Sequence, residues 1–401
     1  MEYYNIQSQE YIKAVSLPAK KYKIKLEFLG VYENVIDEIS QDLSADNQGQ
    51  ISVNYQQLVR RSCNLTLINV DLKYIPSPNS LVWVDRKFKL WIGLEVGNDI
   101  YWFSQGVYVI TNATNSGADV SIQASDKGSV LNGDVLLGMA ETQYVIESGS
   151  KISDLIKDTL MLDRGNNIPL DSKEPIINTE IGNQITQAEI SIDENSYIGN
   201  IFTNIANGYG ADVYYNSDGR LVIEKMADGD RLDGYKYMGH LWEFDGLTAE
   251  NGKSVDYDFK GINAVTVYTN SNNLKNVSYT AYNNNPLSPL RVDMIGFRRK
   301  ESQEISYVEL DEDKMRERCK DYADYLLYKE SLISMSVSFS SPIIPHLDVN
   351  RTIGVTDEEL GFKNETFVVQ SLSIPLGAGN MSITATNIQW LPTDTDIEKG
   401  A

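Results

Sequence analysis

The sequence has 401 residues, of which 42% are hydrophobic and 23% are charged, and these proportions exclude a largely disordered chain. Its 35 basic and 56 acidic residues give a formal net charge of −21, which argues against binding nucleic acid by neutralising phosphates. A chain of this length is expected to fold as about two to four domains.

Neither a membrane segment nor a secretion signal is predicted. No stretch approaches the ~20 consecutive apolar residues of a membrane span. The residues from Met1 to Lys20 lack the basic-then-apolar pattern of a signal peptide. Cys63 and Cys319 are the only cysteines, and we expect two reduced thiols in a protein that folds in the cytosol.

Strand patterns dominate the first 130 residues. From Tyr22 to Phe28 apolar and polar residues alternate, which predicts a half-buried strand. The segment Ile51–Tyr55 resumes this pattern after an expected turn at Asp46–Gly49, and Arg60-Arg61 leads into a further alternation. We predict that residues 1–130 form an N-terminal β-barrel-like domain.

Residues 140–228 have the mixed pattern of a small α/β domain. A first helix is predicted from four apolar residues on one face, Ile152, Leu155, Ile156 and Leu160, with Ser150 as N-cap and Gly165 beyond its end. A second helix runs from Ile198 to Ala206 and is stopped by Gly208. A hairpin is predicted around Asp218-Gly219.

The C-terminal half is again mainly β. Residues 229–310 are predicted as a β-rich segment that contributes to a second barrel, with strand patterns at Ala264–Tyr268 and Val277–Tyr282. Residues 311–401 are predicted as a helix followed by a C-terminal β-barrel-like domain. The helix, Asp311–Glu330, should pack on that barrel through Met315, Cys319, Tyr322 and Leu326.

Three short blocks recur in the same order near the two ends of the chain. The N-terminal blocks are Ile92-Gly93-Leu94, Tyr108-Val109-Ile110 and Ser121–Ser125, and the C-terminal blocks are Ile353-Gly354-Val355, Phe367-Val368-Val369 and Ser382–Thr386. Any two β-meanders share such features, and a duplicated domain is the alternative. The duplication predicts a mainly β fold with two related β-barrel-like domains and a small central α/β domain.

No catalytic, cofactor-binding or metal-binding residue is predicted. His240 and His346, the only histidines, are too few for a triad or a His-rich metal site and are interpreted as loop residues. Asp228-Gly229-Asp230 with Asp233-Gly234 suggests a calcium loop, but its twelfth position is Gly239 rather than glutamate. A β-rich glycosidase with a carboxylate pair remains an alternative.

Three tryptophans, Trp83, Trp91 and Trp102, lie close together in the sequence. They could form a platform for sugars, or they could pack within and around the β-domain. We favour packing, because aromatic residues regularly fill strands.

The chain resembles the baseplate hub proteins of tailed bacteriophages, including the hub module at the N-terminus of tail-associated lysins. The resemblance spans nearly the whole chain. It is carried by Arg60-Arg61-Ser62, Gln105–Ile110, Ala124–Lys127, Asn285–Pro289 with Ile295-Gly296, and the final helix with the second β-unit.

The resemblance implies a structural protein of the virion tail baseplate, made in the host cytoplasm. It implies a homotrimer that forms a pseudo-six-fold ring, joins the tail tube or distal tail protein to a spike or tail-tip protein, and lets DNA pass. The tape measure protein is a further expected partner. Because no lytic domain follows the second β-unit before Ala401, we expect no enzyme activity.

Two further expectations concern the cell wall and the ring. The segment Tyr144–Ser150 with Ile152 and Leu155 looks like the opening of a LysM peptidoglycan-binding module, although no second half is evident after Gly165. This makes a cell-wall binding module of a tail-associated lysin the alternative function. In a trimer with 3 × (−21) = −63 charges, an acidic channel wall would let DNA slide rather than trap it.

Overall fold

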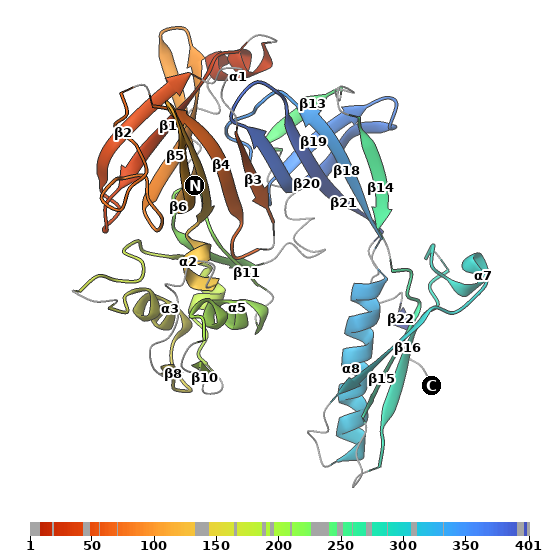
Figure 1. Ribbon diagram of the computed structural model, residues 1–401. Helices are drawn as coiled ribbons and strands as arrows, with labels where there is room; N and C mark the ends of the chain where they lie inside the picture. Colours follow the sequence, from red (N-terminus) through yellow and green to blue (C-terminus); the bar gives the residue numbers. More distant parts are fainter. Residues whose placement is uncertain are drawn as a thin grey trace. The chain divides into compact units, whose positions relative to one another are not determined.

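The computed structural model describes residues 9–17, 20–42, 49–55, 57–69, 71–132, 144–163, 167–186, 190–192, 196–208, 211–225, 240–246, 252–258, 260–269, 275–286, 288–305, 311–331, 333–390 and 397–398. Its strands and helices, shown in Figure 1, confirm the predicted fold class, which is mainly β with smaller α/β parts. None of the helices in these ranges is both long and apolar enough to cross a membrane.

The chain divides into two compact units. Unit 1 comprises Met1–Arg231, Met238–Gly252 and Phe339–Thr384, and unit 2 comprises Leu232–Tyr237, Lys253–Ser338 and Ala385–Ala401. Each unit is therefore built from segments that are far apart in the sequence. The predicted domain boundaries at residues 130, 228 and 310 stay predictions.

Unit 1 begins with helix α1, Gln9–Ser16, and an antiparallel group of strands. Its strands are β1 Tyr22–Leu29, β2 Val35–Asp42, β3 Gly49–Asn54, β4 Arg61–Ile68, β5 Lys87–Val96, β6 Asp99–Ser116 and β7 Asp119–Asp126, in the order β3-β4-β7-β6-β5-β1-β2. As the alternation predicted, Ile24, Leu26 and Phe28 of β1 are buried. The sheet is continued beyond β3 by a strand from near the C-terminus, β20 Phe362–Pro375.

The strand order around β20 matches the order around β6. The second group consists of β13 Trp242–Asp245, β14 Ser254–Asp258, β18 Ile333–Ser341, β19 Thr352–Asp357, β20 and β21 Met381–Trp390. Its pairing order is β14-β18-β21-β20-β19-β13, which corresponds strand for strand to β3-β4-β7-β6-β5-β1. Both groups also keep the same order along the chain, so each repeated set of blocks forms an antiparallel meander within six corresponding strands.

The two groups differ in register and in one strand direction. Ile92 pairs with Phe103, whereas its sequence match Ile353 pairs with Phe367. The turn at Gly97 therefore sets a different register from the turn that precedes Phe362. In addition, β1 is antiparallel to β5, whereas β13 is parallel to β19. The correspondence therefore lies in strand order and not in the residue-by-residue match of the first block.

The predicted α/β region is present in unit 1. It contains α2 Gly128–Asn132, β8 Tyr144–Ile146, α3 Ile152–Leu160, β9 Ile176–Ile177, α4 Thr179–Gly182, β10 Ile190–Ile192, α5 Gly199–Gly208, β11 Ala211–Tyr215 and β12 Leu221–Lys225. The apolar residues that predicted α3 and α5 are buried in one core cluster. The hairpin around Asp218-Gly219 is β11 paired with β12, as predicted.

The start of α3 differs from the prediction. The N-cap position is occupied by Lys151, whose side chain makes no capping hydrogen bond. Ser150 is held in another way, because its hydroxyl donates to the carbonyl of Glu147 at 2.8 Å and its backbone pairs with Thr186. The predicted Ser150 cap is therefore wrong, and Gly165 lies outside the described residues.

Unit 2 contains a four-stranded sheet covered by one long helix. The sheet order is β17-β15-β16-β22, with β15 Ala264–Thr269, β16 Ser278–Asn283, β17 Lys300–Ile305 and β22 Ile397–Glu398. Helix α8, Glu312–Glu330, runs along β15 and β16 (Figure 1). Asp311 caps it by accepting hydrogen bonds from the amides of Asp313 and Lys314.

The buried face of α8 differs from the predicted stripe. The fully buried residues are Met315, Cys319, Ala323 and Leu327, and they pack against Val265, Val267, Val277 and Ala281. Tyr322 is exposed and Leu326 is only partly buried. The helix therefore presents an i, i+4 row to the β15–β16 sheet, and the prediction that it packs on the barrel through Tyr322 and Leu326 is wrong.

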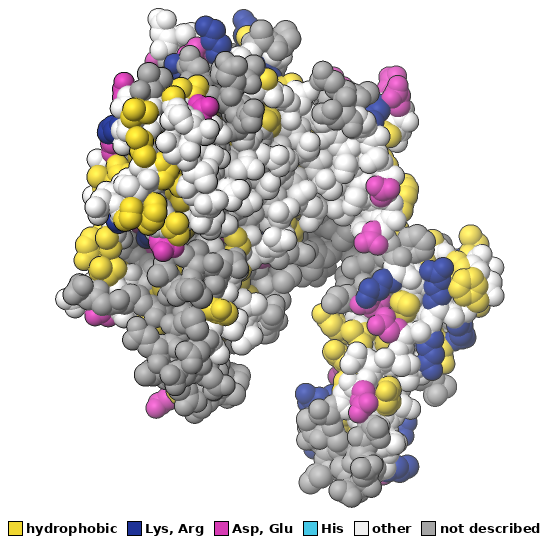
Figure 2. All heavy atoms as spheres, viewed as in Figure 1, with side chains coloured by type: hydrophobic (Ala, Val, Ile, Leu, Met, Phe, Trp, Pro, Cys, Tyr) yellow, Lys and Arg dark blue, Asp and Glu magenta, His cyan; other side chains and the backbone are white. Residues whose placement is uncertain are grey.

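Strand β2 ends the sheet order, pairing with β1 alone among the described strands. Val35 and Ile36 of β2 are exposed, as are Val31 and Tyr32 of the preceding turn. Figure 2 shows hydrophobic side chains gathered over β1 and β2. An exposed apolar patch on an edge strand is a feature of interaction surfaces.

Candidate functional site: a buried ion-pair network

Three of the sequence motifs that carry the hub resemblance meet in one buried network of unit 1. The motifs are Arg60-Arg61-Ser62, Gln105–Ile110 and Ala124–Lys127, which lie at the start of β4, within β6 and at the end of β7. Arg60, Arg61, Gln105, Asp126 and Lys127 are all nearly inaccessible to solvent. Charged residues are rarely buried in this way unless they are paired.

Lys127 lies at the centre of one half of this network. Its Nζ is 2.6 Å from Glu33 Oε1, 2.7 Å from Asp171 Oδ1 and 2.9 Å from the carbonyl oxygen of Gly219. These three acceptors match the three donors of an ammonium group. Asp171 also accepts a hydrogen bond from the hydroxyl of Tyr215 at 2.8 Å. The network therefore joins the β1–β2 turn, the end of β7 and the α/β region.

Glu33 is surrounded by three lysines. Besides Lys127, its carboxylate lies 3.2 Å from Lys87 and 3.0 Å from Lys173. Burial by itself raises the pKa of Glu33, but the lysines outweigh it and lower the pKa to about 2. Glu33 is therefore ionised throughout the physiological pH range.

The two arginines form the other half of the network. Arg60 pairs with Asp212 of β11, and its guanidinium lies 3.2 Å from the ring centroid of Tyr214. Arg61 Nη2 contacts both carboxylate oxygens of Asp348, at 2.7 and 2.6 Å. These contacts hold the α/β region and the segment after β18 against the start of β4.

Asp126 accepts two backbone hydrogen bonds at the end of β7. Its carboxylate oxygens accept from the amide of Arg61 at 2.7 Å and from the amide of Gly128 at 2.9 Å. Burial raises its pKa to about 7 despite these bonds. Gln105 adds a further link, since its side-chain amide donates to the carbonyl of Pro345 at 2.8 Å.

The tip of the β11–β12 hairpin fits closely against this network. Gly219 has a φ of +72°, and a Cβ built there would lie 2.6 Å from Val107 Cγ2. Both the left-handed backbone and the lack of space call for glycine. The sequence predicted the turn at this position but not its contact with β6.

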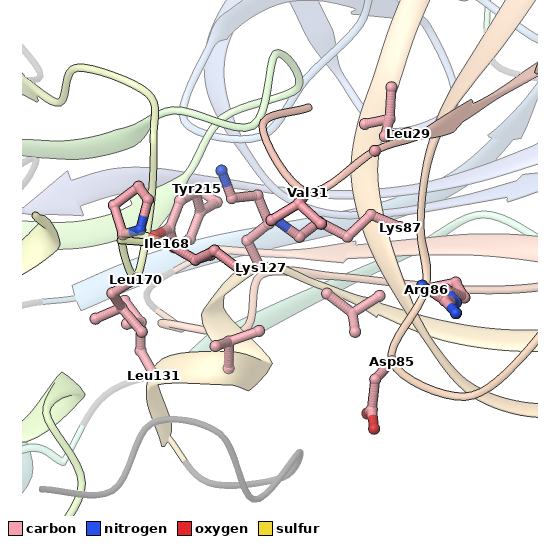
Figure 3. A pocket seen from close by; sticks show the side chains of 14 residues that line it. Leu29, Val31, Asp85, Arg86, Lys87, Lys127, Leu131, Ile168, Leu170 and Tyr215 are labelled. Atoms are coloured by element: carbon pink, nitrogen blue, oxygen red, sulfur yellow. The ribbon is translucent and has the colours of Figure 1, made fainter. Parts of the chain in front are cut away.

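A pocket of about 260 Å³ lies beside Lys127. Figure 3 shows Tyr215, Ile168 and Leu170 on one side of it and Arg86 and Lys87 on the other. Lys127 is already satisfied by its three acceptors, and Lys87 is paired with Glu33. The ammonium groups of both lysines beside the pocket are thus engaged in contacts within the chain.

The remaining candidate residues from the sequence lie apart from this network or serve packing. His240 contacts Glu243 and Thr366 through its two ring nitrogens, at 2.7 and 2.8 Å. His346 is buried, its Nδ1 lies 2.6 Å from the hydroxyl of Tyr11, and burial lowers its pKa to about 4. Cys63 and Cys319 are buried, free thiols.

The tryptophans do not form a common open platform. Trp91 donates from its indole nitrogen to Glu27 at 2.8 Å and has Lys25 and Lys89 over its ring. Trp102 is also contacted by Lys25, whereas Trp83 is exposed in a separate segment. The rings of Trp91 and Trp102 are thus occupied by this chain's own lysines.

Two predicted features fall outside this site. The Asn285–Pro289 motif belongs to unit 2, where the Ser288 hydroxyl accepts hydrogen bonds from Asn283 at 3.0 Å and from the amide of Leu290 at 3.1 Å. The Asp228–Gly234 segment weighed as a calcium loop lies outside the described residues. Among those described, no three His, Cys, Asp or Glu side chains come together as a metal-binding group.

Comparison of the sequence finds no matching family model and no matching curated protein. Comparison of the structure does find relatives. A tail protein from Neisseria meningitidis MC58 matches with a TM-score of 0.53 and 12% identity, over 91% of this chain and 96% of that one. The 43 kDa tail protein of prophage MuSo2 from Shewanella oneidensis matches with a TM-score of 0.51 and 12% identity, over 91% and 98%. This chain has a tail-protein fold.

A similar fold also occurs in a protein from a second kind of assembly. A chain of the half-lidded Francisella PdpA-VgrG complex matches with a TM-score of 0.55 and 10% identity, over 94% of this chain and 60% of that one. At such low identity the likeness concerns the fold alone. At the level of the fold, the likeness agrees with the resemblance to proteins of phage tails that the motifs indicated.

Proposed function

We propose that this chain is a structural hub protein of a phage tail baseplate. Three copies would form a ring of pseudo-six-fold symmetry that joins the tail tube or distal tail protein to a spike or tail-tip protein. The observation that carries the proposal is the tail-protein fold, shared over nearly the full length of two tail proteins. Within that fold, six strands recur in the same pairing order.

The repeated strand order gives a reason for three copies. A ring of three chains with two similar β-groups each presents six similar groups, and so can meet a six-fold tube on one side and a three-fold tip on the other. The buried ion-pair network supports the same function, because a connector needs parts that are held firmly together. The role we propose is structural and not catalytic.

Native mass spectrometry of the purified chain tests this proposal. We expect a species of three times the chain mass at micromolar concentration, and a ring with a central opening in electron micrographs. A chain that remains monomeric as concentration increases would contradict the hub proposal. Co-expression with the tube and tip proteins of the same tail would then show whether either one binds this chain.

DNA passage through the ring is a further part of the proposal. The net charge of −21 per chain supports a channel wall that repels duplex DNA instead of binding it. We expect no measurable duplex binding by the trimer at about 0.15 M salt. Duplex binding at that salt, or a channel lined mainly by Lys and Arg, would contradict an acidic wall.

A second function, binding of peptidoglycan, is favoured by one observation. Strand β10 pairs antiparallel with β8, and α3 and α4 lie between them in the chain. This arrangement supports the proposal of a LysM-like module, whose second half is not evident in the sequence after Gly165. Sedimentation with purified peptidoglycan tests it: the full chain should pellet with the sacculi if this region binds them, and a hub without this activity stays in the supernatant.

A further inference from the structure

Two exposed surfaces of this chain have complementary chemistry. The first is the β2 patch, which we define as Val31, Tyr32, Val35, Ile36 and Glu38. Its four apolar residues are each at least half exposed, and Glu38 is exposed as well. The patch lies on a strand whose second edge has no partner among the described strands.

Acidic and basic side chains both border the apolar centre, since the exposed Arg86 lines a pocket together with Val31. Asp37, beside Glu38, pairs with Lys73 and accepts a hydrogen bond from the hydroxyl of Tyr74. Glu38 has no such lysine in the described ion pairs, and Asp71 in the neighbouring segment is exposed. An apolar centre beside the exposed Glu38 carboxylate fits a partner that offers apolar side chains beside cations.

The second surface is the α7 tip, which we define as Met294, Phe297, Arg298, Arg299 and Lys300. It follows the short helix α7, Val292–Ile295, and leads into β17. All five residues are exposed, with Met294 at 62%. Figure 2 shows hydrophobic and basic side chains beside each other over this part of unit 2.

The chain itself orders the α7 tip. Gly296 ends α7 in a left-handed conformation, and its amide donates to the carbonyl of Val292. Arg298 lies 4.2 Å from the ring centroid of Tyr282, and Arg299 lies 5.3 Å from that of Phe297. Three consecutive cations and two exposed apolar side chains are thus held in one place on a strongly acidic chain.

A second copy of the same chain suits the α7 tip best. Copies with a charge of −21 each repel one another at a distance, so their association needs local attraction at the contact. The tip supplies such a contact, because its cations and apolar side chains match the Glu38 carboxylate and the apolar residues of the β2 patch. The tip and the patch are different surfaces, so the contact is heterologous, and repetition can close a ring.

We propose that the α7 tip of one copy docks on the β2 patch of the next copy around the ring. The inference rests on the proposed hub function, since it names the contact that would hold the trimer together. Nucleic acid would use the cations of the tip but not Met294 and Phe297. A duplex that binds the tip is therefore the competing outcome.

Charge reversal tests the contact through the native mass of the assembly. Lys300→Glu combined with Met294→Asp should shift the trimer toward monomer by at least tenfold in concentration. Adding Glu38→Lys to that variant should recover part of the loss, because the charges are then exchanged across the contact. The control Lys151→Glu with Met161→Asp changes an exposed lysine and an equally exposed methionine on unit 1 and should remain trimeric.

Cross-linking between copies tests the contact directly, without substitutions that are meant to weaken the trimer. Met294→Cys and Ile36→Cys are made on separate chains and co-expressed, so that a disulfide between them can form only between copies. The native cysteines are buried and should not react. We expect a covalent dimer on mild oxidation, and none when Met161→Cys, equally exposed at 62%, replaces Met294→Cys.

The outcomes separate the docking contact from the hub proposal. If the wild-type chain is a trimer but neither reversal nor cross-linking reports the contact, the docking inference is wrong and the hub proposal stands. If the wild-type chain stays monomeric, the hub proposal itself fails. Duplex DNA binding by wild type that is lost in Lys300→Glu with Met294→Asp would assign the tip to nucleic acid and overturn the docking inference.

Discussion

The carboxylate of Glu33 and the ammonium of Lys127 lie 2.6 Å apart, with almost no exposure of either side chain to solvent. Removing one partner of a buried pair leaves the other charge without compensation. We expect Lys127→Met to lower the free energy of unfolding by about 3–5 kcal/mol, measured by urea denaturation. Lys157→Met, which removes an exposed pair with Glu174, should leave the transition unchanged.

The pKa of Glu33 predicts a dependence of stability on acid. The carboxyl has an ordinary value of 4.5, and in the folded chain its pKa is lowered to about 2. Its contribution is complete above pH 4.5, and it is lost as pH falls toward 2, since the unfolded chain takes up the proton first. Wild type should therefore lose more stability than Glu33→Gln between pH 4.5 and pH 2, and parallel profiles would contradict the network.

The register of α8 can be tested with two adjacent leucines. Leu327 is fully buried against the β15–β16 sheet, and Leu326 is only partly buried. Leu327→Ala should cost about 2–5 kcal/mol of unfolding free energy, and Leu326→Ala should cost clearly less. Thermal melts of the two variants measure these losses. A larger loss for Leu326→Ala than for Leu327→Ala would support the buried face predicted from the sequence, which included Leu326.

The hairpin tip at Gly219 has a natural control in Gly117. Both glycines have a positive φ, of +72° and +66°, but a Cβ at Gly117 would meet no atom within 4 Å. Gly117→Ala should cost about 1–2 kcal/mol for the left-handed backbone alone. Gly219→Ala should cost about 1–3 kcal/mol more, because the added methyl group overlaps Val107. If both variants lost the same free energy of unfolding in denaturation experiments, the hairpin tip would be able to shift and accommodate the added methyl group.

Local patterns predicted much of the fold, because local periodicity reports which face of an element is buried. The alternation from Tyr22 to Phe28 predicted β1, and the spacing of Ile152, Leu155, Ile156 and Leu160 predicted α3. In α8 the pattern was ambiguous, since a small residue, Ala323, and not the larger Tyr322 faces the sheet.

The ion-pair network was beyond the reach of sequence patterns. Glu33, Lys127 and Asp171 are far apart in the chain, and spacing carries no information about such contacts. The Ser150 cap failed for a related reason, because Thr186, many residues later, takes up the backbone of Ser150. The Arg60-Arg61 and Ala124–Lys127 motifs, which carry the family resemblance, lie in this network, but the sequence predicted neither the network nor their partners.

The pairing of β3 with β20 has a consequence for how the protein is made. Asn54 of β3 pairs with Ser371 of β20, and 371 − 54 = 317 residues separate them in the chain. At ~5–20 residues per second, a ribosome needs about 15–60 s to make that interval. Throughout this time β3 is a strand edge without its later partner, and it can be recognised by chaperones or by the nascent chains of neighbouring ribosomes. Final folding of unit 1 must therefore wait until β20 has been translated.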